Sequence, residues 1–469
     1  MGVGSVLVRS LLSLEWFEQR PGTVICAIGF VFAVAYLSAT LIFPRGHGRI
    51  VNGDAIQYYA YLRSLAIDHD VDFTNEYAVL YSSNGSADEG EANVWLTRKS
   101  ATGRPVNMMS IGPALLWSPF FLLAYLVALF MRLFGVTAAL DGFSTPFLIS
   151  AGLAGIVYAT LGAYLCYRCC RLLFDNRAAF WGALAAWLAT PAVYYSVISP
   201  AYSHAPSVFA VALFCYVWLA TRDRDDVFRY AAVGLAAGLA AVVRWQDIIL
   251  LLLPGLELVQ ALVRGKRPIA SAISRGVVMV IASGIVLLPQ LLAWQAIYGA
   301  LFVMPQGGGF MKWTDPAIAS VLFSLRHGLF SWTPAVLLAA VGLVFLVRRD
   351  SLLGWGAIAV LCIAIYVNAS VNDWWAGAAF GARRFVSYTV FFALGFSALF
   401  SRPFWQNRPS LLRACTAALV AYNLLFVLQY QMFMRGFEQL VPYPTTARQV
   451  LFDRLVLPWQ LVRAWLNRS

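Results

Sequence analysis

The sequence predicts an all-α, polytopic membrane protein with about 11 to 13 transmembrane helices of roughly 20 residues each. Of its 469 residues, 61% are hydrophobic and 12% are charged, and the mean hydropathy is +0.71. A soluble domain carries about a quarter charged residues. Basic residues gather in short loops between apolar runs, as the positive-inside rule predicts. The net charge of +12 therefore reflects these loops, and no nucleic-acid partner is expected.

Three regions are expected along the chain. Residues 1–22 form an amphipathic cytoplasmic lead, residues 23–432 a transmembrane domain, and residues 433–469 an amphipathic extracytoplasmic tail. The first span, at 23–43, is followed by a large polar loop at 44–110. This loop is expected to be extracytoplasmic and to carry interfacial helices.

The later apolar runs follow one another closely. They lie at about 111–133, 146–166, 180–197, 207–221, 231–243, 248–262, 277–298, 329–347, 353–368, 386–400 and 412–432. Alternate loops are basic, and these are assigned to the cytoplasm. A cytoplasmic lead and a cytoplasmic loop at 168–177 require an even number of crossings between them, but three runs lie there. One of the runs at 111–133 and 146–166 is therefore expected to be interfacial or re-entrant, which is tolerated where protein or water covers the backbone.

Asp54 stands at the start of the first helical pattern in the polar loop. It follows Gly53, which permits a turn, and it precedes apolar residues at helical spacing. The dipole of such a helix keeps a carboxylate ionised, and an ionised carboxylate in a sheltered cleft can act as a general base. The alternative is that Asp54 is the helix N-cap, a common role of Asp. The two roles are compatible.

Two further groups of charged residues fall on the same predicted face. Arg244-Trp-Gln-Asp247 interrupts an apolar stretch, where charges are costly and indicate function; a local Arg–Asp pair that anchors the bend is an equal alternative. Arg383 and Arg384 precede a later apolar run, and paired guanidinium groups suit a phosphate or diphosphate. Such pairs also occur as snorkelling or topology signals. Because this pair falls on the non-cytoplasmic face, we favour a phosphate-binding function.

Metal, redox and nucleotide chemistry receive little support. His204 is one of four histidines, and a lone His is more often structural than a ligand. His69 and His204 could share a divalent metal with loop carboxylates, but no ligand spacing supports this, so metal ligands remain unknown. The seven cysteines lie in or beside apolar runs, as small core residues do. No nucleotide-binding motif is present.

Several short stretches have a recognisable pattern. They are Gly53-Asp-Ala-Ile-Gln-Tyr-Tyr59 and an Asp-rich segment that ends Thr-Asn-Glu-Tyr77, followed by Ile111-Gly-Pro-Ala-Leu-Leu-Trp-Ser-Pro-Phe120, Tyr202-Ser-His-Ala205, Arg326-His-Gly-Leu-Phe-Ser-Trp-Thr-Pro334 and Trp375-Ala-Gly-Ala-Ala-Phe-Gly-Ala-Arg-Arg384. Together they resemble the GT-C superfamily, over roughly residues 23 to 400. Its members are membrane glycosyltransferases that use polyprenyl-phosphate-linked sugars, among them protein O-mannosyltransferases and the aminoarabinose transferase. Many relatives have Asp-Glu where this chain has Asp54-Ala55, and an acidic residue where it has His204, which weakens any metal assignment.

The resemblance implies an enzyme of the inner (plasma) membrane whose active site faces outside the cytoplasm. It would move a sugar from a polyprenyl-phosphate-linked donor to a hydroxyl of a lipid, glycan or protein acceptor, with inversion and with Asp54 as base. The expected donor-phosphate ligands are Arg383, Arg384, Arg244 and Arg104. The expected acceptor or substrate cleft contains Tyr58, Asp72, His204, Asp247 and Trp375.

Two rival functions remain. A transporter or lipid flippase could use the same charges to move a polar headgroup, although transporters have paired halves with matching interrupted helices and no such repeat is found in this sequence. A non-catalytic assembly subunit with the same fold is the third possibility.

Overall fold

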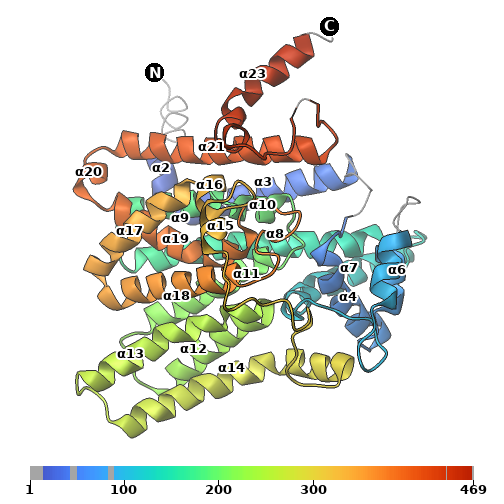
Figure 1. The fold of residues 1–469 in the computed structure, drawn as a ribbon, viewed down its shortest axis with the longest axis horizontal. Coiled ribbons are helices and arrows are strands. Elements are labelled where there is room, and N and C mark those ends of the chain that lie inside the picture. Colours follow the sequence, from blue (N-terminus) through green and yellow to red (C-terminus); the bar gives the residue numbers. More distant parts are fainter. Residues whose placement is uncertain (1–13, 43–49, 83–88, 440, 467–469) are drawn as a thin grey trace.

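The fold is built from helices (Figure 1). The computed structural model describes residues 14–42, 50–82, 89–439 and 441–466. Within these residues the regular structure is helical, and β pairing is confined to isolated bridges, Lys99–Pro105 and Met311–Val371. The all-α prediction is therefore confirmed.

The first half of the chain contains the helices of the polar loop and the first long helices. They are α2 (Leu14–Gln19), α3 (Pro21–Leu41), α4 (Asp54–Arg63), the π-helical turn η2 (Ser64–Asp68), α5 (Thr74–Leu80), α6 (Glu89–Thr97), α7 (Gly112–Leu133), α8 (Thr145–Arg171), α9 (Asn176–Leu188), α10 (Ala192–Val197), α11 (His204–Ala220) and α12 (Val227–Val243).

The second half alternates long helices with short turns. Its elements are η3 (Trp245–Leu251), α13 (Leu252–Val263), α14 (Ile269–Tyr298), α15 (Ile318–Phe323), α16 (Leu329–Trp332), α17 (Ala335–Arg349), α18 (Ser351–Ala369), η4 (Arg383–Tyr388), α19 (Thr389–Phe400), α20 (Pro403–Gln406), α21 (Pro409–Met434), α22 (Ala447–Leu451) and α23 (Asp453–Leu466).

The long apolar helices confirm a polytopic membrane protein. In the described part of the chain, seven helical segments are long and apolar enough to cross a membrane: α3, α7, α8, η3 with α13, α14, α18 and α21. Two shorter apolar helices, α11 and α12, accompany them. These long helices are fewer than the about 11 to 13 spans expected from runs of roughly 20 residues. One reason is that some runs are broken, as at 180–197, where a turn containing Pro191 separates α9 from α10; proline lacks the N–H that a continuing helix needs.

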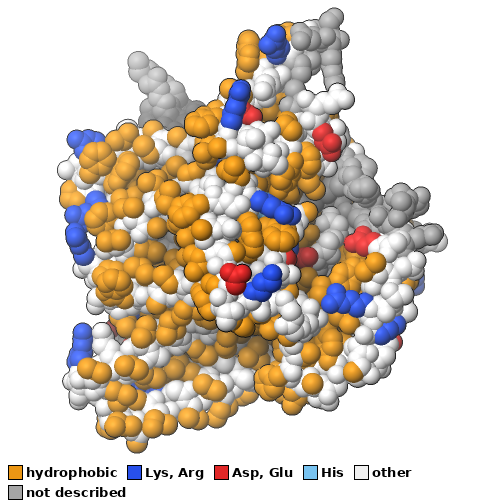
Figure 2. Space-filling view, in the orientation of Figure 1, with side chains coloured by type: hydrophobic (Ala, Val, Ile, Leu, Met, Phe, Trp, Pro, Cys, Tyr) orange, Lys and Arg blue, Asp and Glu red, His pale blue; other side chains and the backbone are white. Residues whose placement is uncertain are grey.

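The basic loops meet at one end of the bundle, here called the basic end. Glu18 binds Arg177 at 3.1 Å and Arg413 at 2.9 Å, which joins α2 to α9 and α21. Arg222, after α11, pairs with Asp350, between α17 and α18. Figure 2 shows basic side chains along this edge of the molecule, beside a largely hydrophobic surface. The loops assigned to one side of the membrane thus lie together in space.

The helix pair α7 and α8 corresponds to the runs at 111–133 and 146–166, and the expectation that one of them is interfacial or re-entrant stays a prediction, since both helices are long and apolar enough to cross a membrane. Gly112 packs on the outer end of α12, where a Cβ would lie 2.2 Å from the Val242 carbonyl oxygen. Farther along α7, Phe121 contacts Phe147 near the start of α8, with ring centroids 4.9 Å apart. From there α8 runs to the basic end. α8 therefore connects the two ends of the bundle, and α7 begins at the end opposite the basic loops, here called the cavity end.

The polar loop packs at the cavity end, where α4 contacts α7, and Figure 1 shows α6 in the same part of the molecule. Arg63, the last residue of α4, binds Glu76 of α5 at 2.6 Å and donates to the Asp141 carbonyl at 2.7 Å. These contacts tie α5 and the α7–α8 connection to the same helix. Because α4 begins with Asp54, they also fix the position of that carboxylate.

Small residues bring α17 and α19 into close contact. A Cβ on Gly342 of α17 would lie 1.8 Å from the carbonyl oxygen of Gly395 in α19. A Cβ on Gly395 would in turn lie 2.2 Å from the Ala339 carbonyl oxygen. Apolar lipid offers helices little hydrophobic drive to associate, so close backbone approach at small residues is a common means of packing in membranes.

Candidate active site

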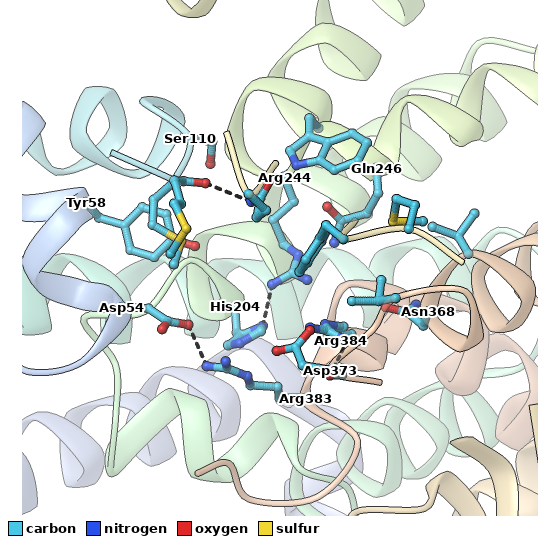
Figure 3. Close-up of a pocket in the computed structure, with 18 residues that line it drawn as sticks. Asp54, Tyr58, Ser110, His204, Arg244, Gln246, Asn368, Asp373, Arg383 and Arg384 are labelled. Atoms are coloured by element: carbon cyan, nitrogen blue, oxygen red, sulfur yellow. Dashed lines mark hydrogen bonds and ion pairs between the residues drawn. The ribbon is translucent and has the colours of Figure 1, made fainter. Parts of the chain in front are cut away.

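A cavity of about 240 Å³ lies at the cavity end, where segments from across the chain converge. Figure 3 draws 18 residues that line it and labels Asp54, Tyr58, Ser110, His204, Arg244, Gln246, Asn368, Asp373, Arg383 and Arg384. Six of the ten site residues expected from the sequence therefore line one cavity, namely Asp54, Tyr58, His204, Arg244, Arg383 and Arg384.

Asp54 is placed by a glycine turn. Gly53 occupies the N-cap position of α4 with φ 54°, and a Cβ there would lie 2.5 Å from the Tyr202 hydroxyl oxygen. The N-cap interpretation of Asp54 is therefore wrong, because Asp54 is the first residue of the helix itself. Its Oδ2 accepts a hydrogen bond from Arg383 Nη1 at 2.6 Å. The carboxylate still lies in the first helical turn, where the helix dipole favours negative charge.

Arg383 and Arg384 are presented by the loop at 370–382 between α18 and η4, here called the arginine loop. This loop turns at Ala376, Gly377 and Gly381, whose φ angles are 61°, 66° and 62°. Such left-handed conformations cost glycine little, whereas other residues seldom adopt them. The turns bring the two arginines back towards the cavity that Asn368, at the end of α18, also lines.

Each of these two arginines is paired with a carboxylate. Arg383 binds Asp54, and Arg384 Nη2 binds Asp373 Oδ1 at 2.8 Å. Burial lowers the pKa of Arg383, but the Asp54 carboxylate raises it, and the net result lies above the usual value. Burial lowers the pKa of Arg384 despite Asp373. The ionic contacts thus offset part of the cost of burying the two guanidinium groups.

Arg244 has neutral partners instead. Its Nη1 lies 2.8 Å from His204 Nδ1 and 3.4 Å from Ser203 Oγ. With the Gln246 amide oxygen turned towards it, Nη2 and Nε donate to that oxygen at 2.6 and 3.0 Å. Because a guanidinium can only donate, His204 Nδ1 must accept, which leaves the imidazole proton on Nε2. The ion pairs formed among the described residues do not include Arg244.

The charges of the cavity are therefore unevenly balanced. Among the residues that line the cavity, two carboxylates, Asp54 and Asp373, face three guanidinium groups, and Arg244 is the guanidinium group that neither of them contacts. An anion with several oxygen atoms matches this arrangement, since guanidinium groups bind such anions through parallel, charge-assisted hydrogen bonds.

Two expected residues lie in the polar loop, away from the residues that line the cavity. Asp72 accepts hydrogen bonds from the Thr74 backbone N–H at 3.1 Å and the Thr74 hydroxyl at 2.6 Å, at the start of α5. Arg104 donates to the Ala296 carbonyl at 2.5 Å, near the end of α14. In this structure both stabilise loop contacts.

The other two expected residues lie behind the cavity wall. Asp247 is fully buried and accepts a hydrogen bond from Ser207 at 3.0 Å. Its backbone N–H donates to the Arg244 carbonyl at 2.8 Å, so the two residues share a turn without forming the Arg–Asp ion pair that was the alternative. Trp375 lies on the far side of the arginine loop, where Arg326 covers its ring at 4.3 Å.

Sequence reasoning assigned no role to several cavity residues. Ser110, Gln306 and Asn368 line the cavity although nothing in their local pattern identified them. Asn368 had a usable signal, because it is a polar residue at the end of an otherwise apolar run. Asp373 and Gln246 fell within the charged motifs, but their pairing with Arg384 and Arg244 depends on the fold.

The cavity does not fit a metal ion. Among the described residues, no cluster of three His, Cys, Asp or Glu side chains is arranged to hold one. The nearest donors are occupied, since Asp54 and Asp373 bind arginines and His204 Nδ1 accepts from Arg244. The divalent metal considered from the sequence therefore enters no step below.

Fold and site together define a polytopic helical membrane protein with an arginine-rich cavity at one end. The chain is similar to a solved structure whose title is that of ArnT from Cupriavidus metallidurans bound to undecaprenyl phosphate. The identity is 14%, the TM-score is 0.48, and the match covers 96% of this chain and 76% of the other. No family model matches the chain, and no curated protein matches it.

Proposed function

We propose that this protein is a membrane glycosyltransferase that takes a sugar from a polyprenyl-phosphate-linked donor and transfers it to an acceptor hydroxyl. The observation that carries the proposal is the convergence of Asp54 with Arg244, Arg383 and Arg384 on one cavity at the end of apolar helices. A lipid-linked phosphate matches both the guanidinium groups and the membrane setting. The resemblance of the sequence motifs to the GT-C superfamily supports the same chemistry.

Asp54 would act as the general base. The acceptor oxygen attacks the anomeric carbon while its proton passes to an Asp54 carboxylate oxygen. The bond between that carbon and the phosphate oxygen breaks, and its electron pair leaves with the phosphate. A single displacement of this kind inverts the anomeric centre and needs one base.

The arginines would stabilise the departing phosphate. Charge stabilisation by preorganised donors is commonly the largest contribution to catalysis. Arg244, which forms no ion pair among the described residues, is the natural first contact for the anion. As the phosphate also approaches Arg383, it would compete for this guanidinium and release Asp54 to the acceptor hydroxyl.

The face of the membrane is part of the proposal. The basic loops gather at the end of the bundle opposite the cavity, and basic loops favour the cytoplasm. We therefore place the cavity on the extracytoplasmic face of the plasma membrane. The acceptor is then a lipid, glycan or protein hydroxyl on that face.

The decisive experiment measures release of polyprenyl phosphate from a panel of polyprenyl-phosphate sugars by the purified protein. We expect Asp54→Asn to lower the rate about 10²- to 10⁴-fold, the usual contribution of general acid–base catalysis. Binding of polyprenyl phosphate should persist or tighten, because Arg383 loses its competing carboxylate. Asp72→Asn is the matched control, since this exposed carboxylate lies outside the cavity, and its rate should equal that of wild type.

A transporter or flippase would give a different result. It would bind the donor and move it across a vesicle membrane without releasing the sugar, in both the wild type and the Asp54→Asn variant. Transfer that continues at more than about a tenth of the wild-type rate in Asp54→Asn would remove this residue as the base, because the expected loss is at least a hundredfold.

A further inference from the structure

The motif Arg326-His-Gly-Leu-Phe-Ser-Trp-Thr-Pro334 lies outside the main cavity, and the proposed mechanism does not use it. It forms a compact turn that ends in α16. The Ser331 hydroxyl donates to the Gly328 carbonyl at 3.2 Å, and Trp332 Nε1 donates to the Leu325 carbonyl at 2.8 Å. A Cβ on Gly328 would lie 2.5 Å from the Ser324 carbonyl oxygen. These internal contacts fix the conformation of the turn, so the His327 side chain leaves it in a defined direction.

His327 points from this turn to two other segments of the chain. Its side chain is buried, and its backbone has φ 64°. Nδ1 lies 2.6 Å from the Trp375 carbonyl oxygen, in the arginine loop. Nε2 lies 2.8 Å from the hydroxyl of Tyr443, in the segment after α21. One imidazole thus joins three parts of the chain.

The hydrogen bonds determine where the imidazole proton lies. A carbonyl oxygen can only accept, so Nδ1 carries the hydrogen and donates to Trp375. In the neutral ring Nε2 then accepts from the Tyr443 hydroxyl. Burial lowers the pKa of His327 to about 4, which keeps the ring neutral near pH 7. The tautomer matches both partners.

The hydrogen bond from His327 to the Trp375 carbonyl holds the arginine loop at a left-handed turn. Trp375 immediately precedes Ala376, which has φ 61°, a conformation that residues with a Cβ seldom adopt. The same turn places Asp373 and leads to Arg383 and Arg384. A second contact also joins the motif to the arginine loop: the Trp332 ring packs on Phe380, with 5.8 Å between centroids.

We propose that His327 is a positioning residue that, with Tyr443, holds the arginine loop in the conformation that brings Asp373, Arg383 and Arg384 to the cavity. The C-terminal segment is then part of the support of the active site, although it does not line the cavity. The chemistry served by this arrangement rests on the proposed function, whereas the positioning itself does not.

Four variants of the full-length protein separate the contacts. His327→Ala removes both hydrogen bonds. His327→Asn keeps an N–H near the Nδ1 position, and Asn tolerates a left-handed backbone. Tyr443→Phe removes only the hydroxyl. Tyr422→Phe is the matched control, because Tyr422 also donates to a carbonyl of the C-terminal segment, that of Leu451 at 2.9 Å, but does not touch the loop.

The first measurement is hydrogen exchange of the loop amides. Ala376 N–H donates to the Asp373 carbonyl at 2.7 Å, and Phe380 N–H donates to the Tyr195 hydroxyl at 3.1 Å, so both should be protected in the wild type. We expect their exchange to accelerate about tenfold in His327→Ala, the effect of losing roughly one net hydrogen bond. The acceleration should be smaller in Tyr443→Phe. His327→Asn keeps the Trp375 bond but loses the Tyr443 bond, so it should restore protection to the level of Tyr443→Phe, and Tyr422→Phe should leave protection unchanged.

The second measurement is the affinity for polyprenyl phosphate in nanodiscs, which should fall in His327→Ala and recover in His327→Asn. Loop amides that stay as protected in His327→Ala and Tyr443→Phe as in the wild type would overturn the proposal. So would an Asn variant no better than the Ala variant in both measurements. If the exchange pattern appears but the wild type binds no polyprenyl phosphate, the proposed function fails and the positioning role stands.

Discussion

Arg244 and Arg383 present the same guanidinium group to one cavity but in different electrostatic surroundings. Arg383 donates to the Asp54 carboxylate, whereas the side-chain hydrogen-bond partners of Arg244 in the described part of the chain are Ser203, His204 and Gln246. Replacing a neutral partner by phosphate adds an ionic interaction, while replacing a carboxylate exchanges one ionic interaction for another. Binding of an anion should therefore depend more on Arg244 than on its two neighbours.

We expect Arg244→Lys to raise the dissociation constant of polyprenyl phosphate about ten- to a hundredfold. An ammonium keeps the charge but not the planar pair of donors, and a hydrogen bond to a charged group is worth about 1.5–3 kcal/mol. Titration of the protein with polyprenyl phosphate in nanodiscs measures this change. Arg384→Lys is the comparison, because Asp373 already balances this residue, and its effect should be smaller. A larger effect at Arg384 would move the phosphate site to the arginine loop.

The site residues were predictable where their chemistry was unusual for their surroundings. Arg244 and Arg383 stand out in sequence because charged groups interrupt apolar runs there, and both line the cavity. Asp247 has the same signal, but a turn directs it to Ser207 behind the wall. Which side of a bend a residue faces depends on backbone angles that hydrophobic patterns do not specify. The pairing of Asp54 with Arg383 was likewise inaccessible, since the two are 329 residues apart.

At the scale of helices, the packing of α17 on α19 depends on glycine. We expect Gly342→Ala to destabilise the protein by more than about 1–3 kcal/mol, the usual cost of overpacking, because the new Cβ would meet the Gly395 carbonyl at 1.8 Å. Gly284→Ala is the matched control: it lies within α14, and a Cβ there meets nothing within 4 Å. Thermal unfolding in detergent should show a lower midpoint for the first variant and an unchanged or higher one for the second. Equal midpoints would mean that α17 and α19 can separate without cost.

The helices themselves were predicted better than their lengths. Apolar runs of spanning length became α3, α8 and α14, and α14 continues through Pro289. The run at 180–197 was divided at a proline, and the run at 386–400 begins with the turn η4 before α19. The average hydropathy along a segment does not reveal such breaks. It measures how apolar the segment is, whereas the turns within these two runs depend on tertiary contacts.

At the scale of the whole molecule, the two ends of the bundle differ in charge and in composition. Cysteine labelling tests the orientation that we propose, in a background from which the seven native cysteines are removed. Ala101→Cys, exposed in the polar loop, should react with a membrane-impermeant thiol reagent in intact cells. Asp223→Cys, exposed at the basic end, should react only after permeabilisation. Labelling of both from the same side would exclude the assignment of cavity and basic loops to opposite faces.

The ion pairs of Glu18 and Asp54 also depend on the order in which the chain is synthesised. The Glu18 partner Arg413 lies 395 residues later in the chain, on the last long helix, α21. Before the ribosome has delivered α21, Glu18 can bind only its earlier partners, Arg177 and Trp181, in α9. Asp54 has to wait as well, because its partner Arg383 follows 329 residues later. A nascent chain stalled before residue 383 would therefore contain most of the long helices but would leave the Asp54 carboxylate without its arginine, and this unpaired charge should make truncated chains recognisable to cellular quality control.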